Sequence, residues 1–275
     1  MKAECRVCPH GCKLEEGQLG FCRGRICRGG KVVCDNYGKI TSIALDPIEK
    51  KPLYHFYPGS RILSVGSYGC NLRCPFCQNC EISMAKETDI DYVKISYEDL
   101  VDKACELKSR GNIGIAYTYN EPLIGYEFVK DCAVLAKKRG LKNVVVTNGY
   151  ICEEPLRELL ESVAAFNIDL KGFTEQFYKK LQGDLETVKN TISIAAQHCH
   201  VEVTTLIVPG ENDSEEEINE LSKWLASINP DIPLHVTRFF PRWKMRDRES
   251  TPVKTVYRLA EIARRNLNYV YEGNV

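Results

Sequence analysis

Four cysteines fall within eleven positions of the segment GCNLRCPFCQNCEIS, which spans residues 69–83. They are Cys70, Cys74, Cys77 and Cys80. Closely spaced thiolates of this kind bind zinc or an iron–sulfur cluster, and four of them would close either site. Three thiolates would instead leave one iron of a four-iron cluster free to bind another molecule. The chemistry of this segment therefore depends on whether Cys80 is a ligand.

A second group of cysteines lies near the N-terminus. The spacing Cys-x2-Cys-x3-Cys-x9-Cys is formed by Cys5, Cys8, Cys12 and Cys22. This short segment has little apolar mass, so a bound metal is expected to stabilise its fold. Four thiolates predict a closed site for zinc or an auxiliary iron–sulfur cluster, and the knuckle-like spacing favours zinc. His10 is an extra candidate ligand, while Cys27 and Cys34 are either alternative ligands or packed side chains.

Strand-like and helix-like patterns alternate from residue 61 onward. The expected strands are RILSVG, IGIAYT, NVVVT, AFNIDL, HVEVTTLIV and PLHVTRF. Amphipathic helical patterns separate them, at residues 97–111, 123–140, 153–163, 174–197 and 214–228, and a last helix is expected at 252–266. This alternation predicts an α/β fold with a parallel sheet and right-handed crossovers. Six strands predict a partial (β/α)6 TIM-like barrel over residues 58–275.

Residues 1–57 are predicted to form a separate cysteine-rich metal-binding segment with a β-hairpin. The expected hairpin is KVVCDNYGKITSIAL, which has two β-prone arms around an Asn-Tyr-Gly-Lys turn.

Polar residues follow the expected strands, where (β/α) barrels carry their chemistry. They include Asn120 and Glu121, Thr147 and Asn148, Asp169 and Lys171, Pro209 after the fifth strand, and His235 within the sixth. Alternation along a strand turns Asp169 and Lys171 to the same side. Such residues on successive strands predict a site at one mouth of the barrel.

The cysteine spacing Cys-x3-Cys-x-aromatic-Cys, with Phe76 at the aromatic position, resembles the signature of the radical S-adenosylmethionine (radical SAM) superfamily. The resemblance extends over essentially the whole chain through CPHGC, DPIEKKPLYHF, YTYNEP, TNGY, NIDLKGF, LIVPGENDS and HVTRFFP. These segments resemble the glycyl-radical-activase-like branch, and in particular the radical SAM member of the AmmeMemoRadiSam system. One departure is Cys80, which stands where those relatives usually carry tryptophan.

The resemblance implies that Cys70, Cys74 and Cys77 bind a 4Fe–4S cluster whose fourth iron chelates S-adenosylmethionine, and that Cys80 is not a ligand. It also implies a set of cofactor-binding residues: Phe76, Asn120, Glu121, Thr147, Asn148, Asp169, Lys171, Pro209 and His235. Asp169 and Lys171 are expected to be catalytic as well. The plainer alternatives are a turn at Asn120–Glu121, an ion pair between Asp169 and Lys171, and a packed core histidine at position 235.

The expected function is reductive cleavage of S-adenosylmethionine to a 5′-deoxyadenosyl radical, which abstracts hydrogen from an unidentified substrate. One alternative is a glycyl-radical-enzyme activase of the pyruvate formate-lyase-activating type. A second alternative is a non-catalytic iron–sulfur or zinc carrier protein. The expected partners are a small-molecule or protein substrate, an electron donor such as ferredoxin or flavodoxin, and companion proteins of the AmmeMemoRadiSam system.

Composition adds limits to these expectations. Lys+Arg and Asp+Glu both number 37, so nothing indicates a nucleic-acid partner. No apolar run approaches the roughly 20 residues that span a bilayer, and the N-terminus has no apolar signal core. Cysteines at this density are expected to hold metal in a reducing compartment, so we expect a cytoplasmic protein without a membrane association.

Overall fold

The computed structural model describes residues 2–275, and an eight-stranded sheet lies at its centre, in the order β14-β13-β12-β11-β10-β9-β7-β6. The six expected strands are all present, as β7 (Arg61–Gly66), β9 (Asn112–Tyr117), β10 (Lys142–Thr147), β11 (Ala165–Asp169), β12 (His200–Ile207) and β13 (Leu234–Arg238). They pair in parallel in chain order. The prediction of an α/β fold with a partial barrel is confirmed.

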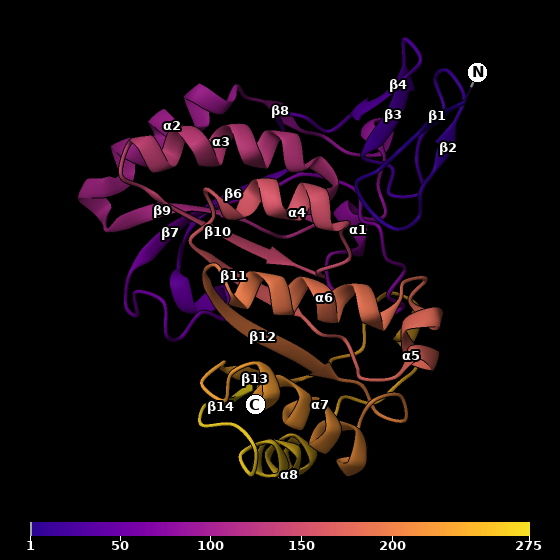
Figure 1. Ribbon diagram of the computed structural model, residues 1–275, viewed down its shortest axis with the longest axis vertical. Helices are drawn as coiled ribbons and strands as arrows, with labels where there is room; N and C mark the ends of the chain where they lie inside the picture. Colours follow the sequence, from indigo (N-terminus) through magenta and orange to yellow (C-terminus); the bar gives the residue numbers. More distant parts are fainter. Residues whose placement is uncertain (1) are drawn as a thin grey trace.

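Helices connect successive strands and cover the outer face of the sheet (Figure 1). They are α2 (Tyr97–Glu106), α3 (Tyr126–Lys138), α4 (Glu153–Leu160), α5 (Glu175–Lys180), α6 (Leu185–Ala196), α7 (Glu215–Ile228) and α8 (Val253–Ala263). The short α1 (Cys80–Ser83) follows the cysteine-rich loop. Single 3-10 turns are η1 (Ile48–Lys50), η2 (Glu87–Asp89), η3 (Leu107–Arg110), η4 (Pro122–Gly125) and η5 (Trp243–Met245).

The sheet has an additional strand at each edge. β14 (Val270–Gly273) lies parallel to β13, and β6 (Ser42–Pro47) lies antiparallel to β7. β14, which is four residues long and follows the last helix, was not expected from the sequence. The start of β6 was expected to belong to the hairpin of the N-terminal segment.

The predicted hairpin in residues 31–45 is wrong in its pairing. β4 (Lys31–Cys34) pairs with β3 (Arg25–Arg28), across a turn at Gly29 and Gly30 with φ of 59° and 71°. A two-residue hairpin turn with positive φ at both positions favours such a Gly-Gly pair. β5 (Lys39–Ile40) pairs with β8 (Val93–Lys94), while β6 joins the large sheet over six residues.

The remaining N-terminal ribbon consists of β1 (Ala3–Glu4) and β2 (Lys13–Leu14), which are antiparallel. Strands β1 to β4 project together at one corner of the molecule (Figure 1). Since β6 belongs to the large sheet, the boundary near residue 57 does not separate two sheets. The division into residues 1–57 and 58–275 stays a prediction.

Residues 48–57 form a plug inside the barrel. Ile48, Leu53 and Phe56 are buried in one cluster with side chains from β7, β9, β10 and β11. The backbone of the plug is fixed by inward-facing polar side chains. Asn167 Nδ2 donates to the Pro52 carbonyl at 2.8 Å. The plug thereby closes the barrel beneath the carboxyl ends of the strands.

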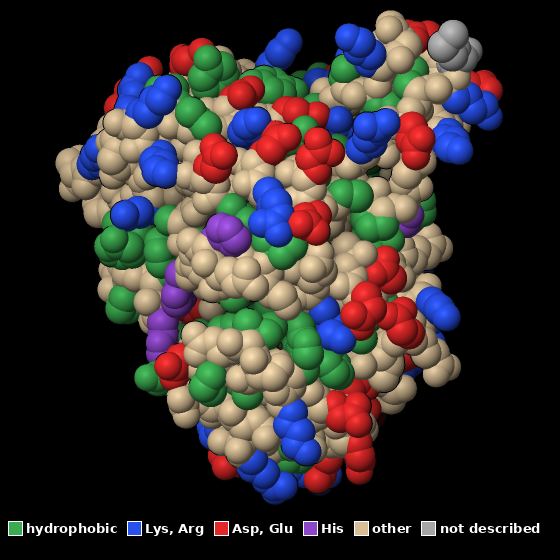
Figure 2. Space-filling model, viewed as in Figure 1, with side chains coloured by type: hydrophobic (Ala, Val, Ile, Leu, Met, Phe, Trp, Pro, Cys, Tyr) green, Lys and Arg blue, Asp and Glu red, His purple; other side chains and the backbone are tan. Residues whose placement is uncertain are grey.

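The face shown in Figure 2 carries Lys and Arg side chains interspersed with Asp and Glu, with hydrophobic side chains between them. Within residues 2–275, no helix is both long enough and apolar enough to cross a bilayer.

Candidate active site

A cavity of about 410 Å³ lies at the carboxyl ends of the parallel strands. Six of its lining residues come from the loop between β7 and α1, and the others include residues that follow β9, β10 and β11. The predicted site residues on its wall are Cys70, Cys74, Phe76, Cys77, Asn120, Glu121, Thr147, Asn148, Asp169 and Lys171. One cavity therefore brings together ten of the twelve residues predicted to bind the cluster or the cofactor.

The cysteine loop places three thiols on the cavity wall and leaves the fourth outside it. Cys80 does not line the cavity and is the first residue of α1. Cys70 Sγ accepts hydrogen bonds from the Leu72 amide at 3.4 Å and from Asn148 Nδ2 at 3.6 Å. Such donors to a cysteine sulfur are typical of iron–sulfur sites, where they adjust the reduction potential.

The three thiols of Cys70, Cys74 and Cys77 are the groups in the cavity that could bind an iron–sulfur cluster. All 14 cysteines are free thiols, and burial raises the pKa of Cys74 to about 12. A thiol in such a site ionises when a metal binds it. Within residues 2–275, no group of three or more His, Cys, Asp or Glu side chains stands in an arrangement that could hold a metal ion. The coordination geometry is therefore not preformed in the described chain.

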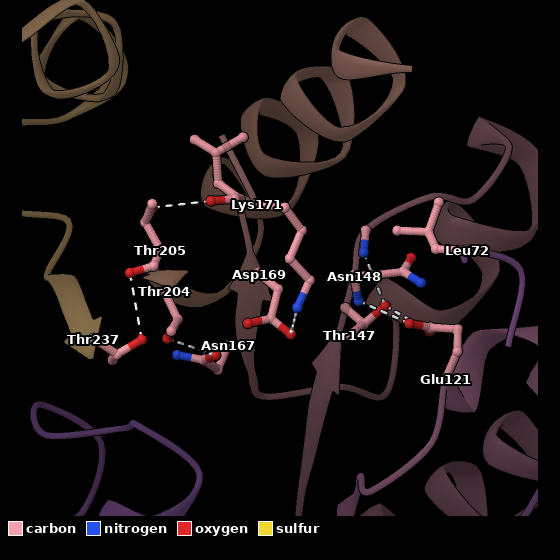
Figure 3. A network of polar contacts seen from close by, with 12 residues as sticks. Leu72, Glu121, Thr147, Asn148, Asn167, Asp169, Lys171, Thr204, Thr205 and Thr237 are labelled. Atoms are coloured by element: carbon pink, nitrogen blue, oxygen red, sulfur yellow. Dashed lines mark hydrogen bonds and ion pairs between the residues drawn. The ribbon is translucent and has the colours of Figure 1, made fainter. Parts of the chain in front are cut away.

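Glu121 joins the loops that follow β9 and β10 (Figure 3). Its Oε1 accepts hydrogen bonds from Thr147 Oγ1 at 2.6 Å and from the Leu123 amide at 3.0 Å, while its Oε2 accepts from the Asn148 amide at 2.7 Å. Burial raises the pKa of Glu121 to about 7, although these three hydrogen bonds favour its charged form. Glu121 therefore organises this wall of the cavity, and a role in binding a cofactor amino group stays a prediction.

Asn120 fixes the start of the cysteine loop. Its Oδ1 accepts from the Ser67 amide at 2.9 Å, and its Nδ2 donates to the Gly69 carbonyl at 3.1 Å. The carbonyl of the preceding residue, Tyr119, accepts from Asn79 Nδ2 at 2.7 Å. The segment YTYNEP is thus bound to both ends of the loop that carries the three cysteines.

Asp169 and Lys171 face each other in the centre of the network in Figure 3, with Lys171 Nζ 2.8 Å from Asp169 Oδ2. Burial lowers the pKa of Lys171, but the negative charges of Asp169 and the Cys74 thiolate outweigh it, so the pKa is raised above its ordinary value. The ion pair that was the plainer alternative for these two residues is present. It also lines the cavity, so a cofactor or substrate role remains compatible with it.

Two predicted cofactor residues do not line the cavity. His235 is buried, and its Nε2 lies 2.7 Å from Glu202 Oε2. The carbonyl of Pro209 accepts from Arg248 at 3.1 Å. Phe76 does line the cavity, and its ring stacks on Phe177 with centroids 6.1 Å apart. For His235, the geometry thus favours the plainer alternative, in which the side chain is a packed core residue.

Several cavity residues were not singled out in the sequence. They include Lys50 and Lys51 of the plug, and Tyr119 after β9. The two lysines lie within DPIEKKPLYHF, a segment that resembles radical SAM relatives but for which the sequence suggested no chemical role. Adjacent lysines usually lie on a solvated surface, so only the plug structure reveals that they face a cavity.

The N-terminal cysteines gather beside the cysteine loop. Cys5, Cys8 and Cys22 are buried, and Cys12 is half-buried. The Cys5 amide donates to the Cys12 carbonyl at 2.9 Å. Burial, together with the neighbouring thiolates of Cys5 and Cys12, raises the pKa of Cys22 to about 11. The Cys22 carbonyl accepts from the Cys70 amide at 3.1 Å, so the two cysteine groups are neighbours in space.

His10 is already engaged, since its Nε2 lies 2.8 Å from the Asn71 carbonyl and its ring packs on Phe21. The guanidinium group of Arg73 also lies over the Phe21 ring, 3.8 Å from the ring centroid. These contacts bind the N-terminal segment to the cysteine loop through polar and aromatic groups.

Comparison with known proteins assigns the family. The sequence model of the radical SAM superfamily matches residues 64–225. The "Uncharacterized protein MJ0808" of Methanocaldococcus jannaschii is 41% identical over 278 residues, which cover 100% of this chain and 82% of the relative. The pyruvate formate-lyase 1-activating enzyme of Escherichia coli (strain K12) is 25% identical over 181 residues, which cover 62% of this chain and 70% of that enzyme.

Among solved structures, Streptococcus suis SuiB bound to precursor peptide SuiA is similar to this fold, with a TM-score of 0.61 at 17% identity. The match covers 82% of this chain and 51% of that one. This similarity concerns the fold alone. The match over residues 64–225 contains the cysteine loop and strands β9 to β12, so the chain belongs to the radical SAM superfamily and is an enzyme.

Proposed function

We propose that the protein reductively cleaves S-adenosylmethionine and uses the resulting radical to abstract hydrogen from a substrate. A 4Fe–4S cluster with bound S-adenosylmethionine would supply one electron to break the sulfonium S–C5′ bond, which gives methionine and a 5′-deoxyadenosyl radical. The observation that carries this proposal is the common cavity of Cys70, Cys74 and Cys77, with Cys80 outside it. Three thiolate ligands would leave one iron of the cluster free to bind the cofactor, whereas four would occupy every iron.

The residues of this chain have separable roles in the proposal. The Asn148 amide group and the Leu72 backbone hold Cys70 by hydrogen bonds to its sulfur. Glu121 fixes the loops after β9 and β10 against each other. The pair of Asp169 and Lys171 presents both signs of charge to the cavity and is suited to a zwitterionic amino acid group. The barrel plug excludes water from below.

The direct test is anaerobic reconstitution with iron and sulfide, followed by incubation with dithionite and S-adenosylmethionine. We expect slow formation of 5′-deoxyadenosine and methionine in equal amounts, without added substrate. Chromatography of the quenched reaction measures both products, and a reaction without dithionite is the control. A cluster-loaded, reduced protein that leaves S-adenosylmethionine intact would refute the proposal.

The substrate is a separate question. The relative named pyruvate formate-lyase 1-activating enzyme supports the alternative that this protein activates a glycyl-radical enzyme, but at 25% identity over 62% of the chain. We retain it as the second candidate, with a protein backbone as substrate. An electron donor such as ferredoxin or flavodoxin, and companion proteins of the AmmeMemoRadiSam system, remain the proposed partners. Membership of an enzyme family disfavours the non-catalytic carrier.

We further propose that Cys5, Cys8, Cys12 and Cys22 hold a second metal, with zinc favoured over an iron–sulfur cluster. The support is the burial of three of the four residues, the backbone hydrogen bond from the Cys5 amide to the Cys12 carbonyl, and the electrostatic influence of Cys5 and Cys12 on Cys22.

Replacement of both Cys5 and Cys8 by alanine should remove this second metal while the cluster of the cavity is retained. Metal binding to such a segment contributes directly to its folding, so we also expect faster proteolysis of the N-terminal ribbon. Elemental analysis for zinc and iron measures the first effect, and limited proteolysis the second. A double alanine variant at Cys105 and Cys199, both half-buried cysteines elsewhere, is the matched control. Equal metal contents in the two variants would rule out the N-terminal site.

A further inference from the structure

Two lysines of the plug share one carboxylate at the cavity wall. Lys50 Nζ lies 3.2 Å from Asp46 Oδ1, and Lys51 Nζ lies 2.9 Å from Asp46 Oδ2. Both lysines line the cavity. The other carboxylates on its wall are engaged, since Asp169 pairs with Lys171 and Glu121 accepts three hydrogen bonds. This part of the wall therefore has one positive charge in excess.

Lys51 is the unusual member of the pair because its side chain is only 4% exposed. Its ammonium group has three N–H donors, and Asp46 is its one hydrogen-bond acceptor among residues 2–275. Lys51 Nζ also lies over the ring of Tyr119, 4.8 Å from the ring centroid. A buried cation with unused donors at a cavity wall is costly unless a ligand supplies the missing acceptors.

Tyr119 connects this cation to the cysteine loop. Its hydroxyl donates to Asp46 Oδ2 at 2.8 Å, while its carbonyl accepts from Asn79 Nδ2 at 2.7 Å. Its φ of 72° is left-handed, which is uncommon for a residue with a bulky side chain. Gly66 permits this conformation, because a Cβ there would lie 2.8 Å from Tyr119 Cβ. Strain of this kind persists where the surrounding structure fixes it, often at a binding site.

We infer that Lys51, assisted by Lys50, binds an anionic group of the substrate, a carboxylate or a phosphate monoester of a small molecule. The inference rests on the proposed function, since it names the substrate class of the same cavity. An oxygen of such an anion would accept an unused N–H donor of Lys51 in a charge-assisted hydrogen bond. The hydroxyl groups of Thr204 and Thr237, which also line the cavity, suit a polar ligand. Tyr119 then sets the position of this anion site relative to the cysteine loop.

Titration calorimetry of the cluster-loaded, S-adenosylmethionine-bound protein with inorganic phosphate, and separately with acetate, tests this inference at constant ionic strength. The measurement needs no reductant and no turnover, so its result is independent of whether S-adenosylmethionine is cleaved. We expect Lys51→Met to weaken binding of the preferred anion at least about tenfold, as for the loss of one charge-assisted hydrogen bond. Asp46→Asn should strengthen binding, because it removes the competing carboxylate. Tighter binding of phosphate or of acetate identifies the kind of anion.

The controls separate a ligand site from a structural ion pair. Lys223→Met, an exposed lysine on α7, should leave both affinities unchanged. Lys51→Arg keeps the charge and should retain most of the binding, which keeps the test valid if Lys51→Met fails to fold. Unchanged affinity in a folded Lys51→Met variant would overturn the inference. Where Lys51→Met does not fold, an Asp46→Asn variant that binds no more tightly than the wild type would overturn it, as would the absence of binding of either anion to the wild type.

Discussion

Replacement of Cys74 by alanine is expected to abolish both the 4Fe–4S cluster and the formation of 5′-deoxyadenosine. Each of the three cavity cysteines supplies one iron ligand, and the buried site has no other free thiol on its wall among residues 2–275. We expect an iron content near zero and a product yield at least about 100-fold lower, as is usual for loss of a group without which the chemistry cannot start. Iron analysis, the visible absorption spectrum and product chromatography of anaerobically prepared protein measure the effect.

Cys80→Ala is the matched control, three residues beyond the last predicted ligand. Cys80 begins α1 and lies outside the cavity, so we expect the cluster spectrum and most of the S-adenosylmethionine cleavage to persist. Its thiol is half-buried, and its loss should cost only about 1 kcal/mol of packing. A cluster lost equally in both variants would show that the loop uses four ligands.

The difference between these two cysteines could be predicted from the sequence only through the resemblance. Spacing alone allows four ligands, because the segment has no feature that turns Cys80 away. The structure supplies the physical reason, which is that the chain enters a helix at that residue. Its amide lies in the first turn, and Met84 donates to its carbonyl at 3.0 Å.

The six barrel strands were predictable because each is a short apolar run followed by an amphipathic helix. The two edge strands were not predicted correctly, and the reason differs between them. β14 contains few apolar residues and is bound to the sheet by its neighbour β13. β6 was recognised in part as a strand, but its partner β7 comes after the plug, so local turn signals pointed to the wrong pairing.

The charged residues inside the barrel were the least predictable part of the site. Glu202 is the third residue of the strand HVEVTTLIV and is fully buried. Its Oε1 accepts from the His55 amide at 2.8 Å and its Oε2 from the Tyr54 amide at 3.0 Å. Nε2 of His200 and Nε2 of His235 complete the set, at 2.9 and 2.7 Å. Sequence gives no sign of this contact, because 147 positions separate Glu202 from His55.

Glu202→Gln is expected to destabilise the protein by about 3 kcal/mol at pH 7. Burial raises the pKa of Glu202, but its four hydrogen bonds outweigh this and lower the pKa from 4.5 to about 2. Such a shift corresponds to about 3 kcal/mol of stability. The amide of glutamine would also point N–H donors at two groups that themselves donate. Thermal unfolding of the anaerobically prepared proteins, followed by circular dichroism, measures the difference.

The dependence on pH gives this prediction its control. A carboxylate with a lowered pKa in the folded state stabilises it above pH 4.5, and this stabilisation is lost as the pH falls from 4.5 toward 2. The difference between wild type and Glu202→Gln should therefore be full at pH 7 and much smaller at pH 3. Glu220→Gln, at an exposed position of α7, should change stability by less than about 0.5 kcal/mol at either pH. A deficit of Glu202→Gln that persists undiminished at pH 3 would mean that Glu202 acts through packing, and that its charge does not hold the plug that presents Lys50 and Lys51 to the cavity.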